Sequence, residues 1–572
     1  MTTTQLAAIS VADIAVLSTV QLGGLTAGDV GALSTTQINA LSTTAIVNLS
    51  TAQIGGLTVA QVAGLTTTKF LALTPGEIDS LSAIQLAAIS VADMAVLSTV
   101  QLGGLTAGDI GGLSTTQINA LSATTIVNLS VSQLGGLTTT QIAGLTTTKF
   151  TTLSSSQLVG LTPTQFAAIS TTDMAVMTTT QFAGLTPQTL GGLSTGQVSA
   201  LNTTDIAAMT VTQLGGLSAA QIGALTATQS TAFGTTAISA LTAEQVAGLT
   251  TAHIAGLNVT KFGALSSTQL SVFAATQLTA ITATDMAALT TAQLSGLTAA
   301  QIGAFTTTQI NAFSSIAVGA LSVLQVGGLT VAQLGSLSTT KFAALTPTAF
   351  GALTVTQIAS MSIAGIATLT TVQLGGLSGT QIGAFSTTQI NAFSATGIAA
   401  LSVEQLGGLT STQITGLSTT KFGAFTSTEL GALTAAQIAA ISTTDIAVLT
   451  TTQLGGLSST AINSLTTAQI AAINTTDIAA ISALQLSGFG AAQIAALSTT
   501  QINTFATANI GALSATQLGG LTTTQIGGLS TIRFGALTSA QFNALTAAQI
   551  AAMSTTDVAV LTTAQLGGFD SA

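Results

Sequence analysis

The sequence contains no cysteine, tryptophan or tyrosine, and it has a single histidine. Without cysteine the chain can form neither a disulfide nor a thiolate metal site. Charged residues make up 4% of the chain, against about 25% in ordinary globular proteins. Six basic residues cannot build the cationic stripe that nucleic-acid binding requires, so we expect no nucleic-acid partner.

Side chains for catalysis are equally scarce. Serine and threonine are abundant, but a hydroxyl needs a neighbouring base to act as a nucleophile. His253 is the only imidazole, and Glu77 and Asp79 are the closest pair of acids. No calcium loop, P-loop or dinucleotide-binding glycine motif is present in the sequence. We therefore predict that the protein is not an enzyme and uses no cofactor and no metal.

Long hydrophobic runs are also missing, although 47% of the residues are apolar. Hydroxyls and amides interrupt every apolar pair, whereas a spanning helix needs about 20 consecutive apolar residues. The chain is therefore not expected to be transmembrane. Its first residues, MTTTQLAAIS, show no basic segment followed by an apolar one, so we expect no cleavable N-terminal signal peptide.

An eight-residue repeat fills the chain in a single phase from Met1 to Ala572, with 71 complete copies and half of another. One copy, LSTTQINA at 33–40, shows the pattern. Position 1 is always apolar, and position 6 is apolar except at Ser230. Position 2 is nearly always Ser, Thr or Asn, position 5 is usually glutamine, and positions 7 and 8 are mostly glycine or alanine. Such a repeat predicts one continuous array over 1–572, without separate caps or linkers.

The spacing of the two apolar positions bears on the secondary structure. Positions 1 and 6 differ by five, so a continuous strand would place them on opposite faces. A turn inside each repeat keeps a β-solenoid open as the alternative, since the threonine content and low charge suit strands. A continuous helix would rotate its apolar stripe by about 80° per repeat. We therefore predict a short helix that restarts in every repeat.

The sequence also contains the signals of a helix start. Ser34 and Gln37 have the spacing of a capping box, and Leu33 and Ile38 that of a hydrophobic staple. All four prolines lie at position 3, the first helical position, where proline is favoured: Pro75, Pro163, Pro187 and Pro347. Glycine at positions 7 and 8 predicts a left-handed or strained helix exit.

Helices this short are unstable alone, because nucleation is costly. Positions 1 and 6 must therefore point into a narrow core that successive helices share. The predicted fold is an all-α solenoid of very short capped helices, one per repeat, with about 3–4 repeats per turn.

A longer period is marked by the basic residues. Each stands at position 5, is followed by phenylalanine, and comes three repeats after a copy that lacks its glutamine, such as the one with Ala45. In five of six cases an acid stands at position 5 three repeats later. We predict that these residues form inter-turn register pairs: Lys69 with Asp93, Lys149 with Asp173, Lys261 with Asp285, Lys421 with Asp445, and Arg533 with Asp557. Recent duplication, with charge kept only for solubility, is the alternative.

The pattern L-[ST]-x-x-Q-[IL]-x-x resembles that of long, low-complexity bacterial octapeptide-repeat proteins described as surface or adhesin-like. The resemblance implies export and a role at the cell surface. Because the repeat stays in phase to the last residues, we expect copies to stack head to tail. The predicted function is that of a structural protein that self-assembles into an extracellular filament, sheath or surface layer. An adhesin stalk and an ice-binding repeat protein are the alternatives.

Overall fold

The computed structural model describes residues 2–569 and contains two compact units, Met1–Ile281 and Thr282–Ala572. Within residues 2–569 the chain forms 71 α-helices and no strand. Each helix has four to six residues and begins at position 3 of its repeat, from α1 (Thr3–Ala7) to α71 (Thr563–Leu566), which is followed by the 3₁₀ turn η1 (Gly567–Phe569). The prediction of an all-helical chain with one short helix per repeat is confirmed. The single array over 1–572 stays a prediction.

The helix starts have the predicted chemistry. Before α5 (Thr35–Ala40), the Ser34 hydroxyl accepts from the Gln37 N–H at 3.2 Å, and Gln37 Oε1 accepts from the Ser34 N–H at 2.7 Å. Leu33 and Ile38 are buried beside this box. Each of the four prolines is the first residue of its helix. Capping satisfies N–H groups that a short helix would otherwise leave without partners.

The prediction of a left-handed exit is wrong. Within the described chain no residue has a positive φ, glycine included. At the end of α7 (Thr51–Gly55), Gly56 has φ −79°. A Cβ on Gly56 would lie 2.4 Å from the carbonyl oxygen of Ala27, which belongs to the level of helices before it. Glycine therefore permits close approach between the backbones of neighbouring levels of helices, rather than an unusual dihedral angle.

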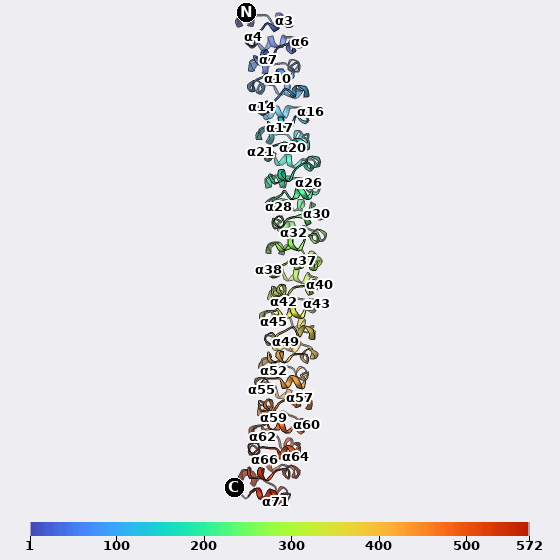
Figure 1. Cartoon of the computed structure of the whole chain (residues 1–572), viewed down its shortest axis with the longest axis vertical. Coiled ribbons are helices and arrows are strands. Elements are labelled where there is room, and N and C mark those ends of the chain that lie inside the picture. Colours follow the sequence, from blue (N-terminus) through green and yellow to red (C-terminus); the bar gives the residue numbers. More distant parts are fainter. Residues whose placement is uncertain (1, 570–572) are drawn as a thin grey trace. The chain divides into compact units, whose positions relative to one another are not determined.

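Within each compact unit, most helices contact the helix three repeats further along the chain. In the first unit α7 contacts both α4 (Ala27–Ala32) and α10 (Pro75–Asp79), and in the second α38 (Ala299–Ala304) contacts α41 (Val323–Gly327). Side-chain hydrogen bonds between these levels join residues 25 to 31 apart in sequence. Residues that meet on successive levels are therefore between three and four repeats apart in the sequence. Within each unit the helices follow one another in a narrow column (Figure 1).

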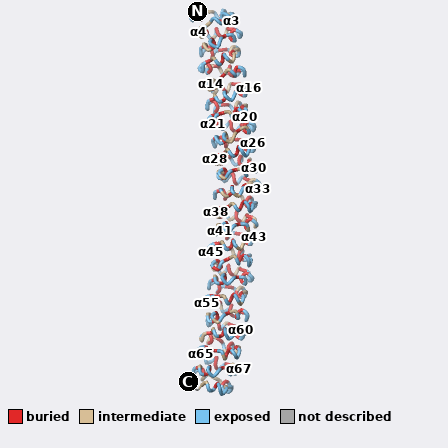
Figure 2. The backbone as a smooth tube through the Cα atoms, in the orientation of Figure 1, coloured by how far each residue is buried: buried red, intermediate tan, exposed pale blue. Residues whose placement is uncertain are grey.

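The core of each unit is made by positions 1 and 6, as predicted. Buried and exposed residues alternate along the trace in both units (Figure 2). Burying each such leucine or isoleucine contributes about 1.5–3 kcal/mol. The one polar residue at position 6, Ser230, is buried and donates its hydroxyl to the Ala227 carbonyl at 2.8 Å. Its polar group is therefore satisfied inside its own helix.

Candidate functional site

The glutamine at position 5 joins its own helix to the level before it. Gln53 is buried, and its Oε1 accepts from the Ser50 N–H at 2.8 Å. Its Nε2 donates to the carbonyls of Leu22 at 2.7 Å and Leu25 at 2.8 Å. Both ends of the carboxamide are thus used. We call this recurring set of bonds the glutamine ladder, and each position-5 side chain one of its rungs.

The capping half of each rung was predicted from the sequence, and the inter-turn half was missed. A signal for it was present. A capping box accepts glutamate as well as glutamine, yet glutamate stands at position 5 only as Glu77 and Glu429. A preference for the amide indicates that a donor is required as well as an acceptor.

The only histidine reproduces the chemistry of a rung. His253 Nδ1 accepts from the Thr250 N–H at 3.2 Å, and its Nε2 lies 2.7 Å from the Leu225 carbonyl oxygen. The bonds define the tautomer that carries its proton on Nε2. His253 is buried, and its two ring nitrogens make the bonds that a position-5 glutamine makes.

A basic residue at position 5 can supply only the donor. In α9 (Thr67–Phe70), Lys69 Nζ donates to the Leu41 carbonyl, 28 residues earlier. It leaves the N-cap amide of Thr66 without its usual acceptor. Asn39 supplies the acceptor instead. Its Oδ1 accepts from the Thr66 N–H at 2.8 Å, and its Nδ2 donates to the Gly64 carbonyl at 2.6 Å.

The same compensation accompanies five of the six basic residues. In each case an asparagine at position 7 of the preceding level accepts from the N-cap amide of the helix that carries the basic residue: Asn39, Asn119, Asn311, Asn391 and Asn503. The sixth, Lys261, follows Asn258, an N-cap whose Oδ1 accepts from the Lys261 N–H at 3.0 Å. Sequence reasoning missed these asparagines, although their constant distance from the basic residues was visible.

The helices that carry the predicted register pairs are neighbours in four of the five cases. They are α9 and α12 (Val91–Val96), α19 (Thr147–Phe150) and α22 (Thr171–Ala175), α53 (Thr419–Phe422) and α56 (Thr443–Ala447), and α67 (Thr531–Phe534) and α70 (Thr555–Ala559). Lys261 and Asp285 belong to different compact units.

The charged groups of these pairs have separate hydrogen-bond partners. Lys69 donates to Leu41, whereas Asp93 Oδ2 accepts from the Ser90 hydroxyl at 2.6 Å. The other oxygen, Asp93 Oδ1, is buried without a hydrogen-bond partner. The polar bonds that cross between levels at these helices therefore end on backbone groups.

An acid at position 5 keeps the acceptor oxygen of the glutamine amide but lacks its N–H donor. Burial raises the pKa of Asp205 from 3.8 to about 6, although a 2.7 Å bond from Asn202 Nδ2 to its Oδ2 acts in the opposite direction. Burial likewise raises the pKa of Glu77, whose Oε1 has no partner. The pKa values of Asp173, Glu429 and Asp477 are raised by burial in the same way. At Asp29, which is partly exposed, the bond from the Thr26 N–H lowers the pKa.

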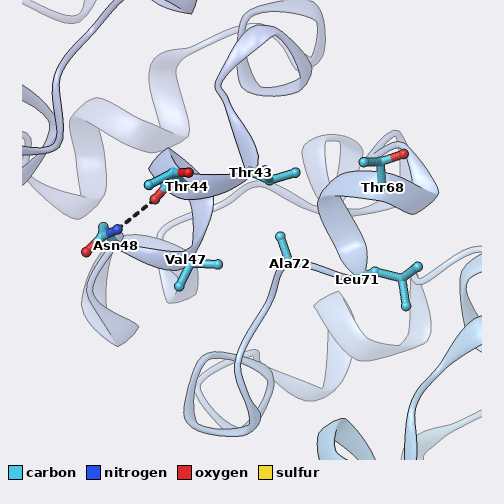
Figure 3. Close-up of a pocket in the computed structure, with 7 residues that line it drawn as sticks. All are labelled: Thr43, Thr44, Val47, Asn48, Thr68, Leu71 and Ala72. Atoms are coloured by element: carbon cyan, nitrogen blue, oxygen red, sulfur yellow. Dashed lines mark hydrogen bonds between the residues drawn. The ribbon is translucent and has the colours of Figure 1, made fainter.

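The hollow drawn in Figure 3 lies between α6 (Thr43–Val47) and α9 and has a volume of about 430 Å³. Its polar walls include Thr44 and Asn48, and Asn48 Nδ2 donates to the Thr44 carbonyl at 2.7 Å. No titratable side chain lines it. Across residues 2–569 no three His, Asp or Glu side chains form a group that could hold a metal. A search of the same residues finds no helix long and apolar enough to cross a bilayer.

These features define the class of the molecule: it is a repeat protein of short helices. The repeat that its segments match is the ALTTAQ repeat. The eight matching segments are residues 30–67, 86–123, 174–211, 198–235, 278–315, 438–475, 470–507 and 534–571. No curated protein matches the chain in sequence.

Proposed function

We propose that this chain is a structural protein, built as a solenoid of about 3–4 repeats per turn, that assembles head to tail into an extracellular filament, sheath or surface layer. The contacts that most helices of each unit make with the helix three repeats later support the solenoid. The ladder gives every turn one side that presents amide donors and one that presents backbone carbonyls. Two copies of the chain could therefore make the contact that two successive turns make.

The observation that carries the assembly is a pair of complementary exposed surfaces. Gln5 and Gln21 are exposed at position 5, whereas every position-5 glutamine from Gln37 onward is buried. At the other end of the described chain, Val558 and Leu566 are 48% and 49% exposed at position 6. Position 6 is otherwise buried through most of the array. The surface with Gln5 and Gln21 offers amide groups. The surface with Val558 and Leu566 offers apolar groups of the kind that are buried elsewhere in the array.

Burial of the second surface against the first would remove apolar area from water and pair the free amides. The contact is heterologous, and copies joined in this way extend without closing. A location outside the cell and a surface role rest on the resemblance of the repeat to bacterial surface proteins.

A charge placed in the contact tests the proposal. Leu566→Lys adds an ammonium to the apolar surface, and Val131→Lys adds one at a side chain of similar exposure, 48%, on a helix inside the array. Light scattering and electron microscopy should show wild type and V131K forming filaments that lengthen with concentration, and L566K remaining short. A wild-type chain that stays monomeric at high concentration, or L566K filaments of wild-type length, would contradict head-to-tail assembly.

A further inference from the structure

Several copies of the repeat lack the position-5 glutamine, and at one of them, in α24, a hollow lies beside the missing rung. In α24 (Pro187–Gly191), position 5 is Thr189 instead of glutamine. Regular rungs show where the missing amide would bind. Gln165 Nε2, for example, donates to carbonyls 31, 30 and 28 residues earlier: Leu134 at 3.1 Å, Gly135 at 3.1 Å and Leu137 at 2.6 Å. The equivalent carbonyls for position 189 belong to Leu158, Val159 and Leu161, and that of Leu158 already accepts from the N–H groups of Gly160 and Leu161.

Thr189 does not replace the missing bonds. Its hydroxyl lies 2.9 Å from the Thr186 hydroxyl, and its N–H donates to the same oxygen at 3.2 Å. Threonine can reach the earlier level, because Thr125 Oγ1 donates to the Leu97 carbonyl at 3.1 Å. Thr189 is instead turned toward its own helix cap.

Three backbone groups around Thr189 therefore lack the partners that a regular rung provides. They are the N–H of Thr186 and the carbonyls of Val159 and Leu161. In a regular rung the position-5 amide oxygen accepts a hydrogen bond from that N–H, and the amide nitrogen donates to such carbonyls. The described structure contains no hydrogen bond to either carbonyl and none from this N–H. One donor and two acceptors in this arrangement are the complement of a primary carboxamide.

A hollow of about 240 Å³ lies at this place. Val159 and Leu161 line it, so the residues that carry the two free carbonyls form part of its wall. Pro163 and the buried Phe166 add apolar lining, and α24 with its C-cap contributes Gln188, Thr189 and Gly192. The hollow thus joins a polar end, at the vacant rung, to an apolar wall large enough for a small ring.

We propose that this hollow binds small primary carboxamides that carry an aromatic or apolar body. The amide nitrogen donates to the carbonyls of Val159 and Leu161, and the amide oxygen accepts from the Thr186 N–H. The body packs against Pro163 and Phe166. The ligand completes the rung that the sequence leaves open at Thr189.

The same geometry rejects close analogues. A carboxylate of equal shape has no donor and brings negative charge against two carbonyl oxygens. A hydrocarbon fills the volume but leaves all three backbone groups unpaired, which costs free energy. Benzamide, benzoate and toluene therefore share a similar ring but differ in the hydrogen-bond donors and acceptors that they offer to the three backbone groups.

The test uses the full chain and benzamide as the probe, with binding followed by ligand-observed NMR and calorimetry. We expect benzamide to bind in the millimolar range, and benzoate and toluene to bind much more weakly. Thr189→Gln restores the common residue of the ladder and fills the hollow, so it should weaken benzamide binding roughly tenfold or more. Thr140→Gln adds the same side chain at an exposed position 4 and is the matched control.

Because T189Q restores the repeat consensus, we expect it to fold, and circular dichroism with thermal melting verifies this. T140Q should bind benzamide as the wild type does. The proposal is overturned if the wild type does not bind benzamide, if T189Q binds it equally well, or if benzoate binds as tightly as benzamide.

Discussion

Asn39 Oδ1 accepts a 2.8 Å hydrogen bond from the backbone N–H of Thr66, a residue that lies 27 positions later at the start of a helix in the next level. The bond takes over what a glutamine at position 69 would do, since Lys69 has no acceptor. Asn39 and Lys69, which lie on successive levels, therefore form one functional unit of the ladder.

This relationship predicts non-additive effects on stability. Asn39→Ala removes the acceptor for the Thr66 N–H and should destabilise the region by about 1–2 kcal/mol. Lys69→Gln supplies a new acceptor and should restore most of the loss in the double variant, because the two side chains serve the same amide. Hydrogen exchange at Thr66 measures the effect. Asn48→Ala removes only a bond within one helix and serves as the control; equal losses in N48A and N39A, or no rescue by K69Q, would contradict the account.

Replacing Glu77 with glutamine should raise the free energy of unfolding by an amount that depends on pH. Burial raises its pKa, so the folded state binds the proton more tightly than the unfolded state. The free energy of unfolding therefore falls as pH rises from about 4.5 through the folded pKa, and the full penalty applies above it. Glu77→Gln adds the missing donor and should raise the melting temperature at pH 7, with little gain at pH 4. Glu244→Gln, at an exposed position, should change little at either pH, and an equal gain from both variants would refute the explanation.

The pKa shifts of Asp205 and Asp29 predict opposite effects of ionisation on the free energy of unfolding. The pKa of Asp205 is raised to about 6 from 3.8, so its ionisation destabilises the fold as pH rises between these values, by at most about 3 kcal/mol. Asp205→Asn should stabilise the protein at pH 7 and flatten the stability profile between pH 4 and 6. The pKa of Asp29 is lowered, so its ionised form stabilises the fold, and Asp29→Asn should not stabilise at pH 7. Melting curves of both variants across pH 3–8 check the two signs.

Adjacent glycines at one helix end predict contrasting outcomes. A Cβ on Gly136 would lie 2.0 Å from the Ala107 carbonyl oxygen, whereas one on Gly135 meets nothing within 4 Å. Gly136→Ala forces two backbones apart and should destabilise by about 1–3 kcal/mol. Gly135→Ala replaces a helical glycine in open space and should stabilise by about 0.5–1 kcal/mol. If the G135A and G136A variants have the same melting temperature, close approach is not the function of Gly136.

Local chemistry explains why much of the fold could be predicted from the sequence. Ser34 and Gln37 determine where a helix starts, and Leu33 and Ile38 determine which side is buried, all within one repeat. The glycine exit was predicted incorrectly, because local rules give glycine a dihedral function and cannot show that Ala27 lies against Gly56.

The inter-turn partners could not be predicted for a related reason. The number of repeats in a turn follows from packing between levels, and no eight-residue pattern contains it. Because a level is longer than three repeats, Gln53 reaches Leu25 and Lys69 reaches Leu41, each 28 residues earlier. The constant separation between the position-7 asparagine and the basic residue, as in Asn39 and Lys69, was the available signal, since it records both ends of one inter-turn bond set.

The central claim is that the position-5 glutamine ties its helix to the level before it, and Gln53→Glu tests it most directly. The variant keeps the acceptor for the Ser50 amide and loses the donor to Leu22 and Leu25. Hydrogen exchange at pH 7, read by mass spectrometry, should show protection lost both in α7 and around Leu25. Both losses should diminish on acidification, as the carboxyl gains a proton. Wild-type protection around Leu25 in Q53E would show that glutamine is only a helix cap and would contradict the ladder.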